Sequence, residues 1–108
     1  MEFRILGPLE VVDDGDAVSL GGTRQRALVA VLLLNANEVV STDRLLEDVW
    51  GERLPETGVK ALHVAVSQLR KTLGAEANGR LATRPPGYVL RVADDELDLH
   101  RFERLAAD

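Results

Sequence analysis

The segment TGVKALHVAVSQLRKTL, which spans residues 57–73, decides the fold of this chain. Its large apolar residues recur at steps of three and four, which predicts one helix with a single buried stripe. The residues of this stripe are Val59, Leu62, Val66, Leu69 and Leu73. The opposite face carries Thr57, Lys60, Val64, Ser67, Gln68 and Lys71, with His63 and Arg70 on its flanks. No acidic residue interrupts this face, whereas a helix that is merely solvated usually mixes both signs of charge.

The chemistry of this face is that of a nucleic-acid contact. Lysine reaches phosphates, glutamine and serine reach base edges, and an exposed valine contacts the methyl group of thymine. The formal net charge of the chain is −5, but residues 57–92 have a balance of +5, against −6 for residues 1–56 and −4 for residues 93–108. Such a block is typical of contact with an acidic polymer, and a chance cluster on a solvated face is the alternative.

Residues 80–92, RLATRPPGYVLRV, predict a β-hairpin after this helix. Pro86 and Gly87 suit the two central positions of a type II turn, because proline fixes φ and glycine accepts a positive φ. Arg84 then lies beside the tip, either free to contact a ligand or paired with an acidic neighbour inside the fold. Tyr88 has two interpretations, a core anchor under the hairpin or a contact with the ligand.

The residues before the central helix predict a small sheet and two further helices. Residues 2–20 contain short runs of alternating apolar residues separated by turn signals, including Asp14-Gly15-Asp16, which predicts three antiparallel strands. Thr23 is the expected cap of a core helix, and Ser41 or Thr42 is the expected cap of a second helix that runs through Trp50. We therefore expect an α+β fold with an N-terminal antiparallel sheet, three helices and a C-terminal β-hairpin, followed by an unfinished amphipathic helix.

Composition excludes several classes of function. The chain has no cysteine, so it has no disulfide, thiolate metal site or cysteine nucleophile. Its longest apolar run, residues 27–34, is too short to cross a membrane, and no leader-like segment precedes the fold, so we expect a cytoplasmic protein. His100 with Asp98 lacks a third metal ligand, and Gly21-Gly22 lacks the other residues of a phosphate loop. We expect neither catalysis nor a cofactor or metal.

The order of sheet, three helices and hairpin resembles the winged helix-turn-helix domains of the OmpR/PhoB type. The resemblance covers residues 2–92 and rests on VSQLRKTL at residues 66–73 and RPPGYVL at residues 84–90. A fuller set of motifs is similar to the SARP regulators of actinobacterial secondary metabolism. These motifs are FRILGPLEV from Phe3, QRALVAVLLL from Gln25, WGE from Trp50, TRPPGY from Thr83 and DLHRFE from Asp98.

The resemblance implies the sequence-specific DNA-binding domain of a transcriptional activator, with helix 57–73 in the major groove and wing 80–92 at the minor groove. Lys60, Ser67 and Arg70 match phosphate-contacting positions, and Gln68 matches a base-reading position. The full set of expected contacts is Trp50, Thr57, Lys60, His63, Val64, Ser67, Gln68, Arg70, Lys71, Arg84 and Tyr88. Several OmpR-type relatives carry Arg or Lys in place of Ser67 and Gln68, which implies weaker non-specific binding and a different base preference here. Trp50 abuts the phosphate backbone, or it simply ends its helix.

The resemblance also implies domains and partners. Residues 1–92 are the winged helix, and residues 93–108 begin a linker or helix leading to a bacterial transcriptional activation domain absent from this chain. The expected partners are direct repeats in promoter DNA upstream of secondary-metabolite genes, a second copy bound head-to-tail, and RNA polymerase, contacted by Glu52 and Arg53 unless they form a passive loop. Two alternatives stay open: a winged helix that binds an acidic protein, and the N-terminal domain of a larger regulator with an ATPase or a sensor.

Overall fold

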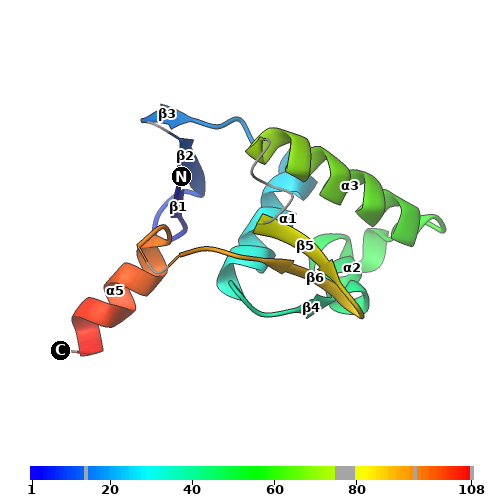
Figure 1. Cartoon of the computed structure of the whole chain (residues 1–108). Helices are drawn as coiled ribbons and strands as arrows, with labels where there is room; N and C mark the ends of the chain where they lie inside the picture. The colour runs from blue at the N-terminus through cyan, green and yellow to red at the C-terminus, as the bar shows by residue number, and fades with distance from the viewer. Residues whose placement is uncertain (14, 75–79, 94, 108) are drawn as a thin grey trace.

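In the computed structural model, which describes residues 1–13, 15–74, 80–93 and 95–107, two small sheets accompany a central group of helices (Figure 1). The N-terminal sheet and the last helix lie on one side of the molecule, and the other helices lie with the second sheet on the other side (Figure 1). The predicted turn residue Asp14 and the acidic residues Glu76 and Asp94 lie outside the described residues. The arrangement confirms the expected α+β class.

The N-terminal sheet contains three short antiparallel strands, as predicted. They are β1 (Glu2–Arg4), β2 (Glu10–Asp13) and β3 (Asp16–Ala17), paired in that order. Phe3 stands opposite Val11, and both side chains are buried. Because side chains alternate along a strand, the neighbours of these two residues are more exposed, and one face of the sheet supplies the core.

The first two helices begin differently from each other. α1 (Thr23–Leu34) is the core helix, but its N-cap position belongs to Gly22, and Thr23 is already its first helical residue, so the predicted threonine cap is wrong. α2 (Thr42–Val49) has one of the two expected caps, because the Ser41 hydroxyl accepts a hydrogen bond from the Arg44 backbone N–H at 3.1 Å. A short 3₁₀ helix, η1 (Gly51–Arg53), then leads towards the third helix.

The third helix, α3 (Gly58–Leu73), turns its apolar stripe to the core with one exception. Leu62, Val66, Leu69 and Leu73 are buried as predicted, whereas half of the Val59 surface (50%) is exposed. Gly58 takes the buried place in the first turn and packs against Leu54 so tightly that a Cβ there would lie 2.5 Å from a leucine methyl carbon. Gly58 precedes Leu62 by about one helical turn, so it continues the stripe and Val59 is turned outward.

The second sheet holds the predicted hairpin. Its strands are β4 (Val40–Ser41), β5 (Leu81–Arg84) and β6 (Gly87–Leu90), in the antiparallel order β4-β6-β5. Arg84 pairs with Gly87, so the two central residues of the turn are Pro85 and Pro86, joined by a cis peptide bond, and the predicted type II turn is wrong. Gly87 is needed for another reason, since a Cβ there would collide with the carbonyl oxygen of Val40 in β4.

Beyond residue 92, Leu97 joins the same core. Leu97 is fully buried and forms a parallel bridge with Phe3. Asp98 begins the last helix, α5 (Asp98–Ala107), and its carboxylate accepts hydrogen bonds from the backbone N–H groups of Ile5 (2.9 Å) and Leu6 (3.2 Å). The predicted C-terminal helix is thus confirmed, while the division of the chain at residue 92 stays a prediction.

Candidate nucleic-acid interface

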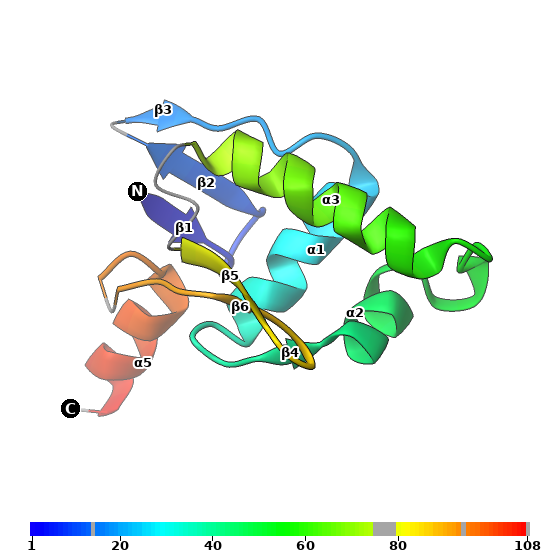
Figure 2. The same ribbon diagram turned by 45° about the vertical axis from the view of Figure 1, so that its right-hand side comes forward.

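Most of the predicted contact residues belong to one helix, α3, which crosses α1 in the view of Figure 2. Its exposed side chains are Lys60, His63, Val64, Ser67, Gln68 and Lys71, and the exposed Thr57 directly precedes the first turn. This face therefore presents two cations, several hydrogen-bonding groups and one large apolar side chain, without a carboxylate between residues 57 and 73. The predicted exposure of each of these residues is confirmed, and their contacts with DNA stay predictions.

Arg70 lies at the edge of this face and is partly buried against the wing. Its Nε donates a hydrogen bond to the Leu81 carbonyl oxygen at 3.1 Å, and its Nη2 donates to the Thr83 hydroxyl at 3.0 Å. Two donors of one guanidinium group thus hold strand β5 against α3. The family resemblance implied a phosphate contact for Arg70, and the structure adds an internal role that joins the two elements of the candidate interface.

The structure places the two predicted contact residues of the wing in different environments, one exposed and one buried. Arg84 is exposed beside the turn and makes no ion pair among the described residues, so the internal acidic partner considered above is not found there. Tyr88 is buried, with 6% of its surface exposed, and belongs to the hydrophobic core opposite Val40. Its interpretation as a core anchor is therefore confirmed, and burial removes Tyr88 from the set of surface contacts.

Trp50 follows α2 and is partly buried, packed against the core. The guanidinium carbon of Arg24, in the first turn of α1, lies 5.8 Å from the centre of that ring, a cation–π geometry. Both interpretations of Trp50 are thus compatible with its position. Arg24 is a surface cation that the sequence reasoning missed, because the periodicity of α1 alone does not indicate which element lies next to its first turn.

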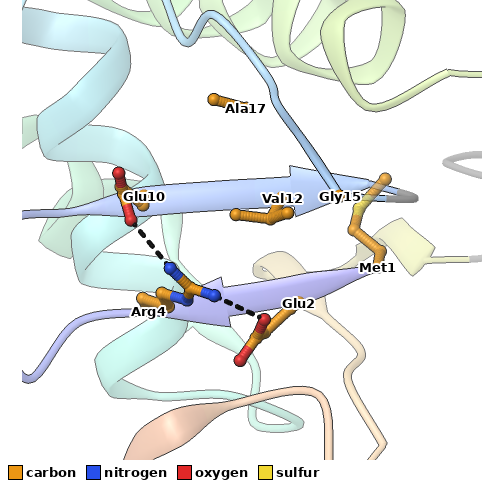
Figure 3. Close-up of a pocket in the computed structure, with 7 residues that line it drawn as sticks. All are labelled: Met1, Glu2, Arg4, Glu10, Val12, Gly15 and Ala17. Atoms are coloured by element: carbon orange, nitrogen blue, oxygen red, sulfur yellow. Dashed lines mark hydrogen bonds and ion pairs between the residues drawn. The ribbon is translucent and has the colours of Figure 1, made fainter.

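The N-terminal sheet carries a hollow that differs from the face of α3 in its charges (Figure 3). It has a volume of about 470 Å³, and Arg4 there forms ion pairs with Glu2 at 2.9 Å and Glu10 at 3.2 Å. The hydrogen bond and charge of Arg4 lower the pKa of the Glu2 carboxyl, and Glu2 in turn raises the pKa of Arg4. Because its cation is already paired with carboxylates, this hollow does not suit a polyanion.

The described part of the chain lacks two further kinds of feature. It contains no group of three or more His, Asp or Glu side chains placed to hold a metal ion. None of its described helices combines the length and apolar character needed to cross a membrane.

Comparison with known proteins decides the family. The sequence profile of the family described as "Transcriptional regulatory protein, C terminal" matches residues 15–90. The chain belongs to this OmpR/PhoB-type family. Its relatives include the transcriptional regulatory protein EmbR of Mycobacterium tuberculosis, 40% identical over 105 residues, which cover 94% of this chain and 27% of EmbR. The regulatory protein AfsR of Streptomyces coelicolor is 35% identical over 108 residues, which cover 99% of this chain and 11% of AfsR. These relatives confirm the SARP resemblance.

Solved structures agree with this assignment. EmbR of Mycobacterium tuberculosis, in complex with a low-affinity phosphopeptide, superposes with a TM-score of 0.89 at 40% identity, over 94% of this chain and 27% of that one. The DNA-binding domain of Escherichia coli CadC superposes with a TM-score of 0.64 at 27% identity, over 78% of this chain and 79% of that one. This OmpR/PhoB-type chain is therefore a winged-helix DNA-binding domain of a transcriptional regulator, and it spans about a third or less of the length of EmbR and AfsR.

Proposed function

We propose that this domain binds promoter DNA with α3 in the major groove and the tip of the β5–β6 wing at the adjacent minor groove. The proposal is carried by the exposed face of α3, which holds Lys60 and Lys71 and no carboxylate. A helix fits the major groove, where its polar side chains reach base edges. Because Arg70 joins α3 to β5, helix and wing meet the duplex in a fixed relation.

The roles of the individual side chains follow from their chemistry. Lys60, Ser67 and Lys71 meet phosphates, which position the domain without reading sequence. Gln68 hydrogen-bonds to a base edge, and Val64 contacts a thymine methyl group. Arg84 reaches the minor groove from the wing, because its weakly hydrated guanidinium suits the negative potential of a narrow groove. Residues at the edges of the surface, Trp50, Thr57 and His63, supply further contacts to the DNA backbone.

The salt dependence of DNA binding tests this proposal. Each phosphate contact that is removed reduces the slope of log affinity against log salt concentration by about 0.9. We expect Lys60→Ala and Lys71→Ala each to reduce this slope by about one unit. Arg101→Ala, on α5, removes the same charge on the other side of the molecule and should leave the slope unchanged. An unchanged slope in both α3 variants would contradict the proposal, and tighter binding to an acidic polypeptide than to DNA would favour the protein-binding alternative.

We further propose that the connector between α2 and α3 contacts RNA polymerase through Glu52 and Arg53. Both side chains are exposed in η1 and take part in no ion pair among the described residues. Replacing the two by alanine in the whole regulator should leave promoter binding unchanged and reduce transcription from that promoter. Unchanged transcription would make the connector a passive loop.

The wider role is proposed on the SARP relatives. We propose a non-enzymatic activator of secondary-metabolite genes that acts in the cytoplasm at the nucleoid and binds direct repeats as a head-to-tail dimer. Residues 1–92 are its DNA-binding domain, and residues 93–108 lead towards a bacterial transcriptional activation domain.

A further inference from the structure

Gln25, in the first turn of α1, touches the base-reading position of α3. Its Nε2 donates one hydrogen bond to the Ala65 carbonyl oxygen and one to the Gln68 Oε1, each at 3.1 Å. Both acceptors belong to α3, so the amide of Gln25 connects the backbone of that helix to the side chain on its outer face. Nothing in the hydrophobic pattern of α1 indicates this contact.

The Ala65 carbonyl oxygen determines which way the Gln25 amide points. A carbonyl oxygen only accepts hydrogen bonds, so Gln25 must turn its NH₂ group, and not its oxygen, towards α3. In this orientation the Gln25 Oε1 is buried and has no hydrogen-bond partner among the described residues. A buried acceptor without a partner is unfavourable, and rotating the amide would place this oxygen against the Ala65 oxygen, which is worse. The orientation is therefore set by α3.

The same logic extends to Gln68. With the NH₂ group of Gln25 facing it, Gln68 must turn its Oε1 inward, because two NH₂ groups would otherwise oppose each other. The Gln68 Nε2 makes no hydrogen bond within the described residues, so this donor is the group left for a ligand. An amide that is free to rotate presents either polarity, whereas this one presents its donor.

We propose that Gln25 is a positioning residue that sets the polarity with which Gln68 meets a base edge. This inference rests on the proposed function, in which Gln68 reads the major groove. The acceptors there are guanine N7 and O6, adenine N7 and thymine O4, whereas cytosine presents a donor. The domain accordingly discriminates against cytosine at the base that Gln68 contacts, and Gln25 contributes to specificity without touching DNA.

The 108-residue chain is first used to select a tightly bound duplex from a pool of randomised DNA, and this duplex is the probe. The affinities of the chain for the probe and for its single-base-pair variants then identify the position that Gln68 contacts. Gln68→Ala should flatten the base preference at one position only. Gln25→Met keeps the length of the side chain and removes its hydrogen bonds, and the hollow of about 350 Å³ beside Gln68 gives its amide room to rotate. We expect Gln25→Met to reduce discrimination at that same position by about threefold to tenfold, with an unchanged salt slope.

A second variant reverses the polarity. Gln25→Glu offers acceptors only, so its carboxylate loses the contact with the Ala65 carbonyl oxygen and turns towards Gln68, whose Nε2 should then point inward and leave Oε1 for the DNA. The preference at the contacted position should then move towards cytosine or adenine, whose exocyclic amines are donors. The added negative charge lowers affinity for every duplex, so base preference is compared as a ratio at one salt concentration. In a Gln68→Ala background, neither Gln25 variant should change the preference further.

The outcomes separate this inference from the function on which it rests. If Gln68→Ala leaves every base preference unchanged, Gln68 does not read a base and the proposed function of that residue is overturned. If Gln68→Ala flattens one position while folded Gln25→Met and Gln25→Glu, checked by thermal unfolding, leave it intact, the positioning role is overturned. A weaker preference in Gln25→Met together with a shifted preference in Gln25→Glu supports it.

Discussion

At the scale of single residues, substitution of Arg84 tests most directly whether the wing contacts DNA. Its guanidinium has no ion-pair partner among the described residues, and its neighbours Pro85 and Pro86 restrict the turn that carries it. An arginine held in place by a rigid turn loses little further entropy on binding. The charge of Arg84 is thus available to DNA and is not required by the fold.

Arg84→Ala is expected to weaken DNA binding by about 1–3 kcal/mol and to reduce the salt slope by about one unit. Arg84→Lys should restore the slope but only part of the affinity for A/T-rich flanking sequence, because an ammonium group is more strongly hydrated. The melting temperature should remain that of the wild type. A lower melting temperature with an unchanged salt slope would instead mean that Arg84 serves the fold.

The residue scale also separates what the sequence could predict from what it could not. Helical periodicity correctly assigned the exposure of Lys60, Ser67 and Gln68, because exposure depends on the helix to which a residue belongs. It could not predict that Arg70 bonds to β5 or that Gln68 bonds to Gln25. Such contacts join segments far apart in the chain, and their geometry depends on how those segments pack.

At the scale of elements, the wing depends on a close approach between β4 and β6. Gly87 pairs with Ser41, and a Cβ on Gly87 would meet the Val40 carbonyl oxygen and the Ser41 Cα. The neighbouring atoms are backbone, which cannot move aside as a flexible side chain could. The second sheet therefore requires glycine at this position for space.

Gly87→Ala is expected to lower the free energy of unfolding by about 1–3 kcal/mol, because the added methyl group forces β4 and β6 apart. Gly7→Ala is the matched control, since a Cβ at Gly7 would have no atom within 4 Å. Chemical denaturation of both variants measures the difference. Equal stabilities would show that the strands accommodate the methyl group.

The same glycine explains why the turn was predicted wrongly. The sequence pattern assigned Gly87 to a turn position that needs a positive φ, but the φ of Gly87 is not positive in the structure. Gly87 is needed because it lets β4 approach β6 closely. The Thr23 cap failed in a similar way, because threonine, a favoured cap residue, here follows a glycine that takes the capping position. Element types follow from local periodicity, whereas caps and turns depend on neighbours that periodicity does not describe.

At the scale of the whole molecule, Glu96 links strand β1 near the N-terminus to Arg80, the residue directly before strand β5. Its carboxylate oxygens accept hydrogen bonds from the Arg80 guanidinium at 2.8 and 2.9 Å and from the Ala93 backbone N–H at 2.8 Å. The Glu96 carbonyl oxygen accepts from the Phe3 N–H at 2.6 Å. The hydrogen bonds from Arg80 lower the pKa of Glu96 and outweigh the opposing effect of partial burial.

This network makes the fold sensitive to acid. A carboxyl whose pKa is lower in the folded state stabilises the fold fully above its unfolded pKa of about 4.3, and this stabilisation is lost as the pH falls through the folded value. Glu96→Gln should therefore lower the free energy of unfolding by about 2 kcal/mol at pH 7 and flatten its decline below about pH 5. Glu103→Gln, an exposed site on α5, is the control. Denaturation curves of Glu96→Gln that parallel the wild type from pH 7 to pH 3 would contradict this role.

The distribution of charge over the whole molecule bears on how two copies share DNA. The N-terminal sheet carries Glu2, Glu10, Asp13 and Asp16 against one Arg4, and it lies at the opposite end of the molecule from the tip of the β5–β6 wing (Figure 1). A head-to-tail contact brings the acidic sheet of one copy towards the basic wing of the next. A two-fold arrangement instead brings the same surface of both copies together, so that charges of the same sign face each other. We therefore expect direct repeats to be preferred over inverted ones.

One domain offers few phosphate contacts, so its binding to a single site should be modest and steeply salt-dependent. A tandem duplex with half-sites about 10–11 bp apart places both copies on one face of the DNA, and the charge complementarity between them then adds to the affinity. Titrations against one-site, direct-repeat and inverted-repeat duplexes measure this directly. We expect cooperative binding on the direct repeat alone, weakened by Asp13→Asn or Asp16→Asn, which change the acidic sheet and leave α3 intact. Equal affinity for all three duplexes, or tightest binding to the inverted repeat, would overturn the head-to-tail arrangement.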